Sequence, residues 1–243
     1  SPGWINYIEQ YYPEFLPNLS TCKSPQQMYG ATVKRYYAKK FNIPLDKLVV
    51  VSVMPCVAKK TELKRPYQSA ADGYQDVDYS ITTRELARMI KRMGIDFLNL
   101  ADEKPDSILG EGSTAGLIFG ATGGVMEAAL RTVKEVVEKK PLEKIDFECV
   151  RGTQGIKRAV VEVNGVDVKV CVASGIANAK VIMEELKSGK ADYHFIEIMC
   201  CPGGCVNGGG QPIQPASVQN SVDIRALRAS AMYSADERAV LRK

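Results

Sequence analysis

Histidine is almost absent from this sequence, since His194 is the only one in 243 residues. Zinc sites are usually built from cysteine and histidine together or from paired C-x-x-C runs, and the chain contains no C-x-x-C run either. A zinc site is therefore disfavoured. A small ferredoxin-like electron carrier is disfavoured as well, because such carriers have closely spaced C-x-x-C runs in a short chain.

Long apolar runs and charge of a single sign are also missing. No stretch approaches the roughly 20 apolar residues that a membrane-spanning helix needs, and the N-terminus lacks the charged-then-apolar layout of a secretory signal. The 32 basic and 28 acidic residues are interspersed and give a net charge of +4. Nothing in this pattern indicates a nucleic-acid or membrane surface. Internal repeats and low-complexity segments are absent too, and the composition is that of an ordinary globular protein.

The two ends of the sequence are unusual. The chain opens at Ser1-Pro2-Gly3-Trp4 without an initiator methionine, and it stops at Leu241-Arg242-Lys243, inside an expected helix. We therefore expect a fragment that lacks material at both ends.

The seven cysteines are what the sequence does have. Four of them lie in or near two short loops that contain glycine or proline, whereas a disulfide framework usually spreads an even number through a small secreted chain. We therefore expect a reducing compartment, the cytoplasm, and thiolate–metal chemistry. The remaining three, Cys22, Cys149 and Cys171, are expected to be structural, because free cysteines are among the most buried residues.

Predicted strands and helices alternate along the chain, which indicates an α/β protein. Residues 48–53 form a continuous apolar run, typical of a strand buried on both faces. Asn164-Gly165 is a strong hairpin signal between two strands. Further strands are predicted at 76–81, 147–151, 158–163, 168–173 and 193–198, and helices at 24–40, 82–94, 125–139, 177–187 and from 222 onward. Ser24 is expected to cap the first of these helices, with Gln27 three residues later.

Two loops follow strands and carry the chemistry. In the first, Met54-Pro55-Cys56 is followed by Lys59 and Glu62, and a short helical turn would bring these side chains to one face. The second runs from Glu197 to Pro212, and Pro-Gly-Gly separates Cys201 from Cys205. Glycines there let the backbone wrap closely around a metal centre and bring amide N–H groups near sulfur. Ligands in α/β folds gather at the carboxyl ends of strands, where both loops lie.

Together these loops resemble the signature motifs of the iron-only (FeFe) hydrogenase large subunit, M-P-C-x-x-K-x-x-E and E-x-M-x-C-x-x-G-C-x-x-G-G-G-Q-P. The resemblance extends to the segments 23–27, 81–87 and 119–129. It implies the α/β catalytic fold of that family, with two lobes of mostly parallel sheet flanked by helices and the active site between them. The expected division is residues 1–105 for part of the first lobe, 106–215 for the second, and 216–243 for the start of a C-terminal helical segment.

The resemblance also implies a cofactor and roles for individual residues. Members of the family carry an H-cluster, a 4Fe-4S cubane joined to a di-iron unit with carbonyl, cyanide and dithiolate ligands. By position, Cys56 and Cys201 match cubane ligands, Cys205 matches the ligand that also bridges to the di-iron unit, and Lys59 matches the lysine that donates to a cyanide. Met54, Met199, Pro25, Gln26, Phe119 and Gly120 are expected to line the pocket, with Ser20 on the proton route and Glu62 near the site.

One position departs from the family pattern. Ser1 stands where the fourth cubane cysteine is expected. Either the preceding residue supplies that thiolate, or Cys200 compensates. Cys200 itself is either a small packing residue or a redox or ligand residue, and the sequence leaves both readings open.

The implied activity is reversible oxidation of H2 to protons and electrons, with ferredoxin or another iron–sulfur carrier as redox partner and hydrogenase maturation proteins assembling the site. A non-catalytic relative, either a sensor or an iron–sulfur assembly factor, is the alternative. An assembly factor has less reason to retain Lys59 and the complete G-G-G-Q-P loop, so their presence favours the enzyme.

Overall fold

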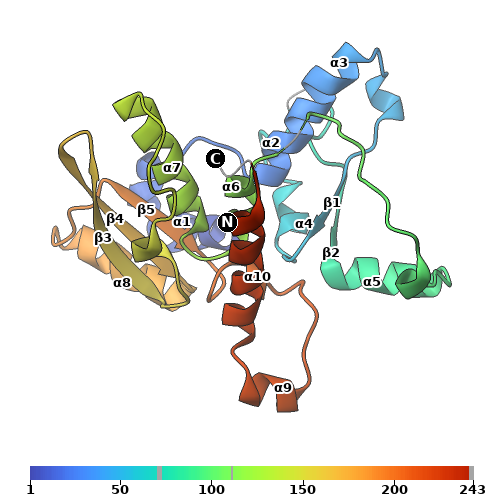
Figure 1. Ribbon diagram of the computed structural model, residues 1–243. Helices are drawn as coiled ribbons and strands as arrows, with labels where there is room; N and C mark the ends of the chain where they lie inside the picture. The colour runs from blue at the N-terminus through green and yellow to red at the C-terminus, as the bar shows by residue number, and fades with distance from the viewer. Residues whose placement is uncertain (70–72, 111, 241–243) are drawn as a thin grey trace.

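The computed structural model describes residues 1–69, 73–110 and 112–240, and its strands form two separate sheets. The sheets lie on opposite sides of helix α10 (Ile224–Arg238), as Figure 1 shows. The helix expected to continue to the end of the sequence ends at Arg238, because Ala239 is extended, and residues 241–243 lie outside the described part of the chain.

The first sheet is small and parallel. Strand β1 (Val51–Met54) pairs with β2 (Tyr79–Thr82) in the register Val51 to Tyr79 and Met54 to Thr82. Two helices surround it, α2 (Pro25–Thr32) and α5 (Thr83–Arg92). Helix α2 continues through the π-helical segment Val33–Tyr37 into α3 (Ala38–Lys40), and the single turn α4 (Lys59–Glu62) follows β1. Both strands end at the same edge of this sheet.

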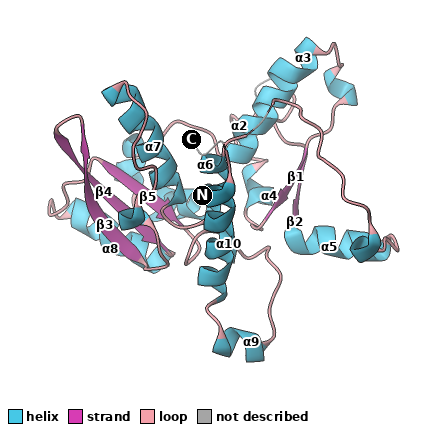
Figure 2. Cartoon of the chain, viewed as in Figure 1, coloured by secondary structure: helices cyan, strands magenta, loops and turns pink. Residues whose placement is uncertain are grey.

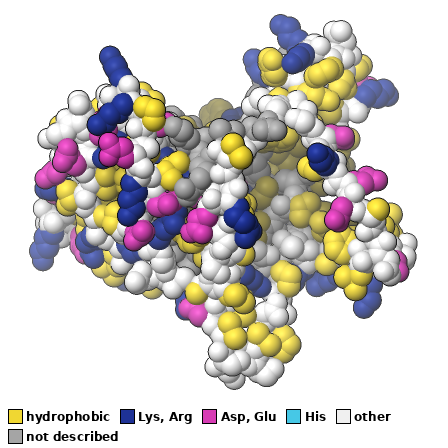
Figure 3. Space-filling view, in the orientation of Figure 1, with side chains coloured by type: hydrophobic (Ala, Val, Ile, Leu, Met, Phe, Trp, Pro, Cys, Tyr) yellow, Lys and Arg dark blue, Asp and Glu magenta, His cyan; other side chains and the backbone are white. Residues whose placement is uncertain are grey.

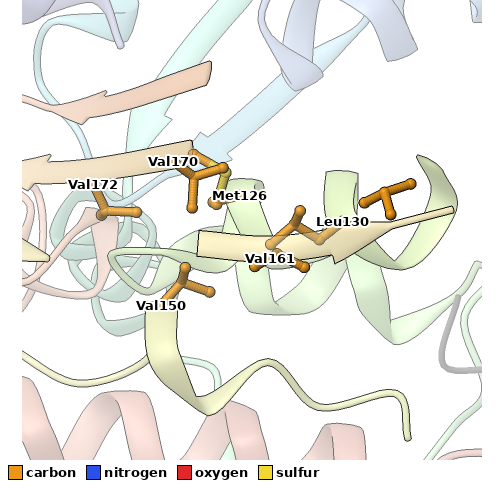
Figure 4. Close-up of a cluster of buried hydrophobic side chains, with 7 residues drawn as sticks. Met126, Leu130, Val150, Val161, Val170 and Val172 are labelled. Atoms are coloured by element: carbon orange, nitrogen blue, oxygen red, sulfur yellow. The ribbon is translucent and has the colours of Figure 1, made fainter. Parts of the chain in front are cut away.

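The second sheet has three strands, β3 (Ile156–Val163), β4 (Val166–Ser174) and β5 (Phe195–Met199). Strands β3 and β4 form an antiparallel hairpin, whereas β4 and β5 are parallel. Helix α7 (Gly124–Glu138) packs on one face through a buried apolar cluster (Figure 4). Its members are Met126, Leu130, Val150, Val161, Val163, Val170 and Val172.

The N-terminal helix α1 (Pro2–Tyr11) packs against α8 (Ile176–Lys187) of the second sheet. Trp4 and Ile8 form a buried cluster with Ala179 and Met183 of α8, and Ile198 of β5 packs against the same cluster. The start of the chain is thereby held close to the carboxyl end of β5. The predicted domain boundaries at 105 and 215 stay predictions.

Two short helices complete the fold, α6 (Thr114–Leu117) and α9 (Ala216–Ser221). Helix α10 is tied to α6 and α7 by buried polar contacts. Asp236 accepts hydrogen bonds from Thr114 Oγ1 at 2.6 Å and from the Arg131 guanidinium at 2.8 and 3.0 Å. The cartoon in Figure 2 shows that long loops make up much of the remaining chain.

The α/β prediction is confirmed, and two of the three strand pairings in the described residues are parallel. The hairpin is confirmed as well: Asn164 and Gly165 both have positive φ, at 51° and 77°, as a two-residue turn of this kind requires. The predicted helices correspond to α2 with its extension through α3, to α5, α7 and α8, and to α10.

Two details of the predicted strands are wrong. Residues 147–151 contain a 3-10 turn at Glu148–Val150, not a strand, and Val150 reaches the core from that turn. Strand β1 is not buried on both faces, because Val51 and Val53 are 51% and 43% exposed. The apolar run indicated a strand correctly but did not show how many of its faces are covered.

The surface agrees with the mixed charge of the sequence. Figure 3 shows basic and acidic side chains interspersed over the visible face, with no area of one sign dominating it. No helix among the described residues is both long enough and apolar enough to cross a membrane.

Candidate metal centre

The two cysteine loops begin at the carboxyl ends of strands from different sheets. Strand β1 ends at Met54, two residues before Cys56, and β5 ends at Met199, directly before Cys200 and Cys201. Free backbone N–H groups in such loops suit anionic ligands, including thiolates. Each loop is thus placed by its strand, as expected from the sequence.

Backbone contacts lock the two loops together. The Gly210 N–H donates to the Pro55 carbonyl at 3.0 Å. A Cβ added at Gly208 would lie 2.0 Å from that same oxygen, and one at Gly210 would lie 2.9 Å from the Cys56 nitrogen. Only glycine fits at this distance, so the glycine run brings the second loop directly against the first.

The three cysteines predicted as ligands lie close enough to influence one another's ionisation. Burial raises the pKa of the Cys205 thiol, and the neighbouring Cys201 and Cys56 raise it further, whereas Lys59 acts in the opposite direction. Cys205 nevertheless has an exposed accessible surface, and Cys56 and Cys201 are half-buried.

The donor set suits an iron–sulfur cluster better than a single ion. In the part of the chain that the structure describes, no three His, Cys, Asp or Glu side chains converge on one metal-ion position. Within a cluster each cysteine binds a different iron, so its thiolates are spread around the cluster and do not meet at one point. Three thiols from two loops, with glycine amides beside them, fit that arrangement.

Lys59 and Glu62 form an ion pair beside the thiols. They occupy the ends of α4, and Lys59 Nζ lies 2.9 Å from Glu62 Oε2. Burial raises the pKa of the Glu62 carboxyl, but Lys59 and hydrogen bonds from Ser24 and Gln26 outweigh that effect and leave its pKa below the ordinary value. Glu62 is therefore held ionised next to Lys59, which interacts electrostatically with the Cys205 thiol.

The Glu62 carboxylate connects α4 to the start of α2. Ser24 Oγ and Gln26 Nε2 both donate to Glu62 Oε2 at 2.7 Å, and Ser52 Oγ donates to Gln26 Oε1 at 2.8 Å. The predicted pocket residue Gln26 is buried, while Pro25 is exposed at the first position of α2. Ser24 does not cap α2 with its side chain as predicted, because its hydroxyl contacts Glu62 instead.

Ser20 and Ser24 differ in their relation to this network. Ser20 is exposed, and its hydroxyl accepts from the Cys22 N–H at 3.2 Å. Ser24, four residues later, makes the contact with Glu62. The role of Ser20 stays a prediction. Sequence reasoning missed Ser24 as a site residue because its position before Pro25 also fits a helix cap.

The segment that holds Phe119 and Gly120 lies against the second cysteine loop. The Thr122 N–H donates to the Gly203 carbonyl at 3.1 Å. A Cβ added at Gly120 would lie 2.4 Å from Met232 Cε of α10, so the glycine lets the end of that flexible side chain approach this segment closely. Phe119 is half-buried, as is Met54 in the first loop, whereas Met199 is buried.

Glu197 holds the segment after Phe119 and Gly120 through hydrogen bonds to the backbone. Its carboxylate accepts from the N–H groups of Gly123 and Met126, each at 2.7 Å, at the start of α7. Burial raises the pKa of Glu197 despite these bonds, and Lys157 donates to the Thr122 carbonyl at 2.9 Å. Sequence reasoning assigned no role to either residue, although Glu197 stands at the start of the second motif.

Arg84 supports the glycine run from the side of α5. Its guanidinium donates to the Gly209 carbonyl at 2.6 Å, and its backbone N–H donates to the Gly210 carbonyl at 3.2 Å. The sequence signal was available, since Thr82-Thr83-Arg84-Glu85 marks a helix start directly after β2. The contact of Arg84 with a loop 125 residues away could not be predicted from the local sequence.

Cys200 and Ser1 complete the surroundings. The Cys200 N–H donates to Ser1 Oγ at 3.2 Å, and a hydrogen bond with the Cys201 thiol lowers the pKa of Cys200 to about 7. Of the three cysteines expected to be structural, Cys171 is buried, whereas Cys22 and Cys149 are exposed, contrary to expectation.

The α/β fold and the cysteine-bearing loops at the ends of two strands define a protein with a candidate iron–sulfur centre. More particularly, it belongs to the iron-only hydrogenase large-subunit family, whose C-terminal domain description matches residues 1–209. Its sequence is 52% identical over 218 residues to the periplasmic Fe hydrogenase large subunit of Nitratidesulfovibrio vulgaris, covering 90% of this chain and 52% of that protein. It is 49% identical to iron hydrogenase 1 of Clostridium pasteurianum, covering 100% of this chain and 42% of that protein.

Structural similarity and more distant relatives extend this result. The fold matches a variant of the FeFe hydrogenase HydA1 from Chlamydomonas reinhardtii with a TM-score of 0.80 and 37% identity, covering 100% of this chain and 66% of that one. A probable cytosolic Fe-S cluster assembly factor of Aedes aegypti is 34% identical, covering 96% of this chain and 50% of that protein. The chain thus spans about half the length of the curated relatives it matches.

Proposed function

We propose that this chain is the part of an iron-only hydrogenase that holds the H-cluster, and that the whole protein interconverts H2 with two protons and two electrons. The observation that carries the proposal is the placement of Lys59. It is ion-paired with a buried carboxylate and lies within electrostatic reach of the Cys205 thiol. A fixed ammonium at a thiolate centre suits an anionic ligand such as cyanide, because charge-assisted hydrogen bonds are about twice as strong as neutral ones.

The residues present suit both parts of the H-cluster. Cys56 and Cys201 would bind the 4Fe-4S cubane, and Cys205 would bind both the cubane and the di-iron unit. When bound, the cluster supplies the redox chemistry. Met54 and Met199 would exclude water with soft, apolar side chains.

The remaining proposed residues shape the pocket and handle protons. Gln26 is held by Ser52 and Glu62, so its position in the wall is fixed, and Pro25, Phe119 and Gly120 would complete that wall. Glu62 accepts hydrogen bonds from the Lys59 ammonium at 2.9 and 3.2 Å and would hold it in place beside the proposed di-iron unit. Its ionised carboxylate can also accept a proton, and Ser20 is proposed to lie further along the same route.

Partners and location follow from the same proposal. Electrons would pass to ferredoxin or another iron–sulfur carrier, and hydrogenase maturation proteins would deliver the di-iron unit. We place the protein in the cytoplasm, because all seven of its cysteines are free thiols, as a reducing compartment favours. One relative is periplasmic by name, so fractionation of the source cells is the direct check. We also propose 1–105, 106–215 and 216–243 as the parts of two lobes and a C-terminal segment.

Infrared spectroscopy of the full-length protein, produced together with maturation proteins, tests the proposal. We expect the stretching bands of metal-bound carbonyl and cyanide, together with H2 turnover. Changing Cys205 to Ala should abolish both, because the di-iron unit loses its attachment, whereas Cys149→Ala should leave both unchanged. Properly matured protein without these bands would remove the hydrogenase function.

A non-catalytic role is the second candidate, supported by the 34% identity to probable iron–sulfur cluster assembly factors. Such a protein would bind a cubane without the di-iron unit, and a sensor would retain both with little turnover. Infrared spectra, electron paramagnetic resonance spectra (which detect the cubane) and H2 turnover together separate the three cases. A cubane signal without carbonyl and cyanide bands indicates an assembly role, while bands with negligible turnover indicate a sensor.

A further inference from the structure

A buried lysine and a buried carboxylate lie in one row across the second sheet. Lys157 of β3 is in register with Val172 of β4, which in turn is in register with Glu197 of β5. Residues in register share a face of the sheet, and Val172 belongs to the apolar cluster that packs against α7. Lys157 is 8% exposed and Glu197 is 5% exposed. Two charges thus flank the apolar contact between the sheet and the helix.

Both charged side chains bind one peptide group. The Lys157 ammonium donates to the Thr122 carbonyl at 2.9 Å, and the Glu197 carboxylate accepts from the Gly123 N–H at 2.7 Å. That carbonyl and that N–H belong to the same peptide group. Because β4 lies between β3 and β5, the backbones that carry the two charges are roughly 10 Å apart. Buried charges need polar partners, and these two charges share this peptide group.

The shared peptide group is adjacent to the second cysteine loop. The Thr122 N–H donates to the Gly203 carbonyl at 3.1 Å, and a Cβ added at Gly204 would lie 2.6 Å from the Thr122 nitrogen. Gly203 and Gly204 are two of the three residues between Cys201 and Cys205. A shift of Thr122 would therefore loosen the backbone that joins two proposed ligands.

The Lys157 ammonium fixes main chain on two sides. Besides the Thr122 carbonyl, it binds the Gly152 carbonyl at 2.8 Å. The close approach requires glycine at position 123, where φ is 91° and an added Cβ would lie 1.8 Å from the Val150 oxygen. Burial lowers the pKa of Lys157 to about 8, and Glu197 acts in the opposite direction. At neutral pH the side chain is therefore largely a cation.

We propose that Lys157 is a positioning residue for the candidate centre, which grips the Thr122–Gly123 peptide group together with Glu197 and so sets how firmly the Cys201–Cys205 loop holds its metal. This inference rests on the proposed function, because it assumes a cluster bound by that loop. The two side chains act through the backbone of Thr122. Partners that orient metal ligands in this way commonly alter metal affinity about 10- to 100-fold when they are removed.

The test uses the full-length protein, reconstituted without oxygen with ferrous iron and sulfide. The cubane is identified as the electron paramagnetic resonance signal that the double variant Cys56→Ala/Cys201→Ala lacks. Its g-values, its midpoint potential and the chelator concentration that removes it are measured for wild type, Lys157→Met, Glu197→Gln and the combination of these two changes. Chemical denaturation gives the free energy of unfolding of each protein.

Lys34→Met is the matched control. Lys34 is also a buried lysine, 2% exposed, and it lies 2.6 Å from the Asp78 carboxylate. Asp78 accepts from the Val50 N–H directly before β1. This ion pair therefore lies at the amino end of the first sheet, whereas the first cysteine loop begins at its carboxyl end. Its loss should destabilise the fold without disturbing the cubane.

We expect Lys157→Met to lose the cubane at a chelator concentration about 10- to 100-fold lower than wild type, with shifted g-values and midpoint potential. Glu197→Gln should act in the same direction. The combined variant should lose less than the product of the two single effects, because both changes release the same peptide group. Lys34→Met should lower the free energy of unfolding but leave the cubane signal and its potential as in wild type.

The possible failures can be told apart. If Lys157→Met keeps the wild-type signal, potential and resistance to chelator, the inference is wrong while the proposed cluster stands. If Lys34→Met changes the cubane as much as Lys157→Met does, the effect is one of stability alone and the inference is overturned equally. Should Lys157→Met fail to fold, a wild-type cubane in Glu197→Gln overturns it. If wild type takes up no cluster that depends on Cys56 and Cys201, the proposed function itself is wrong.

Discussion

At the scale of single residues, the pair of Lys59 and Glu62 is the charge arrangement that most distinguishes this site. The two side chains are only 12% and 9% exposed, so each depends on the other for compensation of its charge. Ser24 and Gln26 also donate hydrogen bonds to the Glu62 carboxylate, at Oε2. The ammonium is thus held in a fixed position beside the carboxylate.

Replacing Lys59 with Ala should therefore have two measurable effects. Leaving Glu62 partly buried and uncompensated should lower the free energy of unfolding by about 2–4 kcal/mol. The matured protein should lose its carbonyl and cyanide bands while retaining the cubane, because the donor to the di-iron unit is gone. Chemical denaturation and infrared spectra measure the two effects.

Lys60→Ala is the matched control for this change. Lys60 also pairs with a carboxylate, Glu85, but the two side chains are 41% and 38% exposed, and exposed pairs contribute little. Wild-type bands and turnover in Lys59→Ala would contradict the role given to this lysine.

Sequence reasoning at this scale found residues that lie in short motifs and missed those placed by distant contacts. Lys59 and Glu62 were paired correctly because the single turn α4 sets their spacing, whereas Cys56 lies before that turn and not on its face. Ser24 was missed because its contact with Glu62 spans 38 positions. The local sequence pattern shows which side chains share a face of a helix, but it does not show which residues pack against that face.

At the scale of elements, helix α5 stands out because its start supports the glycine run of the second cysteine loop. The helix has a complete capping box: Thr82 accepts from the Glu85 N–H, and Glu85 accepts from the Thr82 N–H. Hydrogen bonds from Lys60 and Thr82 lower the pKa of Glu85 to about 2. The cap therefore persists throughout the ordinary pH range and holds Arg84 against Gly209.

Changing Thr82 to Ala should cost about 1 kcal/mol of stability, the usual value for loss of an N-cap side chain. Because the start of α5 then holds Arg84 less firmly against Gly209, amide hydrogen exchange in residues 208–211 should become faster as well. Thr83→Ala removes a threonine hydroxyl one position later, where it is not the helix cap, and should leave exchange in the loop unchanged. Equal exchange rates in both variants would show that the cap does not support the loop.

The elements that were predicted well are those with strong local signals. The capping box fixed the start of α5, and Asn164-Gly165 fixed the hairpin of β3 and β4. The strand predicted at 147–151 failed because Val150 reaches the core from a 3-10 turn, which an apolar pattern alone cannot distinguish from a short strand. Whether the second face of β1 is exposed depends on which other elements pack against it, and the pattern of apolar residues in the strand does not contain that information.

At the scale of the whole molecule, a buried ionic cluster anchors α10 to the second sheet. Arg131, Glu127 and Asp236 are each 0% exposed, and the Arg131 guanidinium bridges the two carboxylates at 2.7 and 2.8 Å. Arg151 adds a second guanidinium on Glu127. Since α10 also places Met232 against Gly120, the cluster holds a wall of the candidate site from a distance.

Asp236→Asn should lower the free energy of unfolding by about 3–5 kcal/mol, because it leaves a buried guanidinium short of one negative charge. The melting temperature of the variant, compared with that of Glu237→Gln, measures this effect. Glu237 is the neighbouring acidic residue and is exposed, so its change should be nearly neutral. Equal melting temperatures would show that Asp236 does not anchor α10.

The contact of Gly208 and Gly210 with Pro55 and Cys56 has a consequence for how the protein is made. More than 150 positions separate these backbones, so a ribosome releases the first loop long before the second exists. Until residue 211 has emerged and the two loops have met, a nascent chain has thiols without the arrangement that the proposed cluster requires. The proposed cluster can therefore form only after the second loop has been made, and products truncated before the glycine run should bind no such cluster.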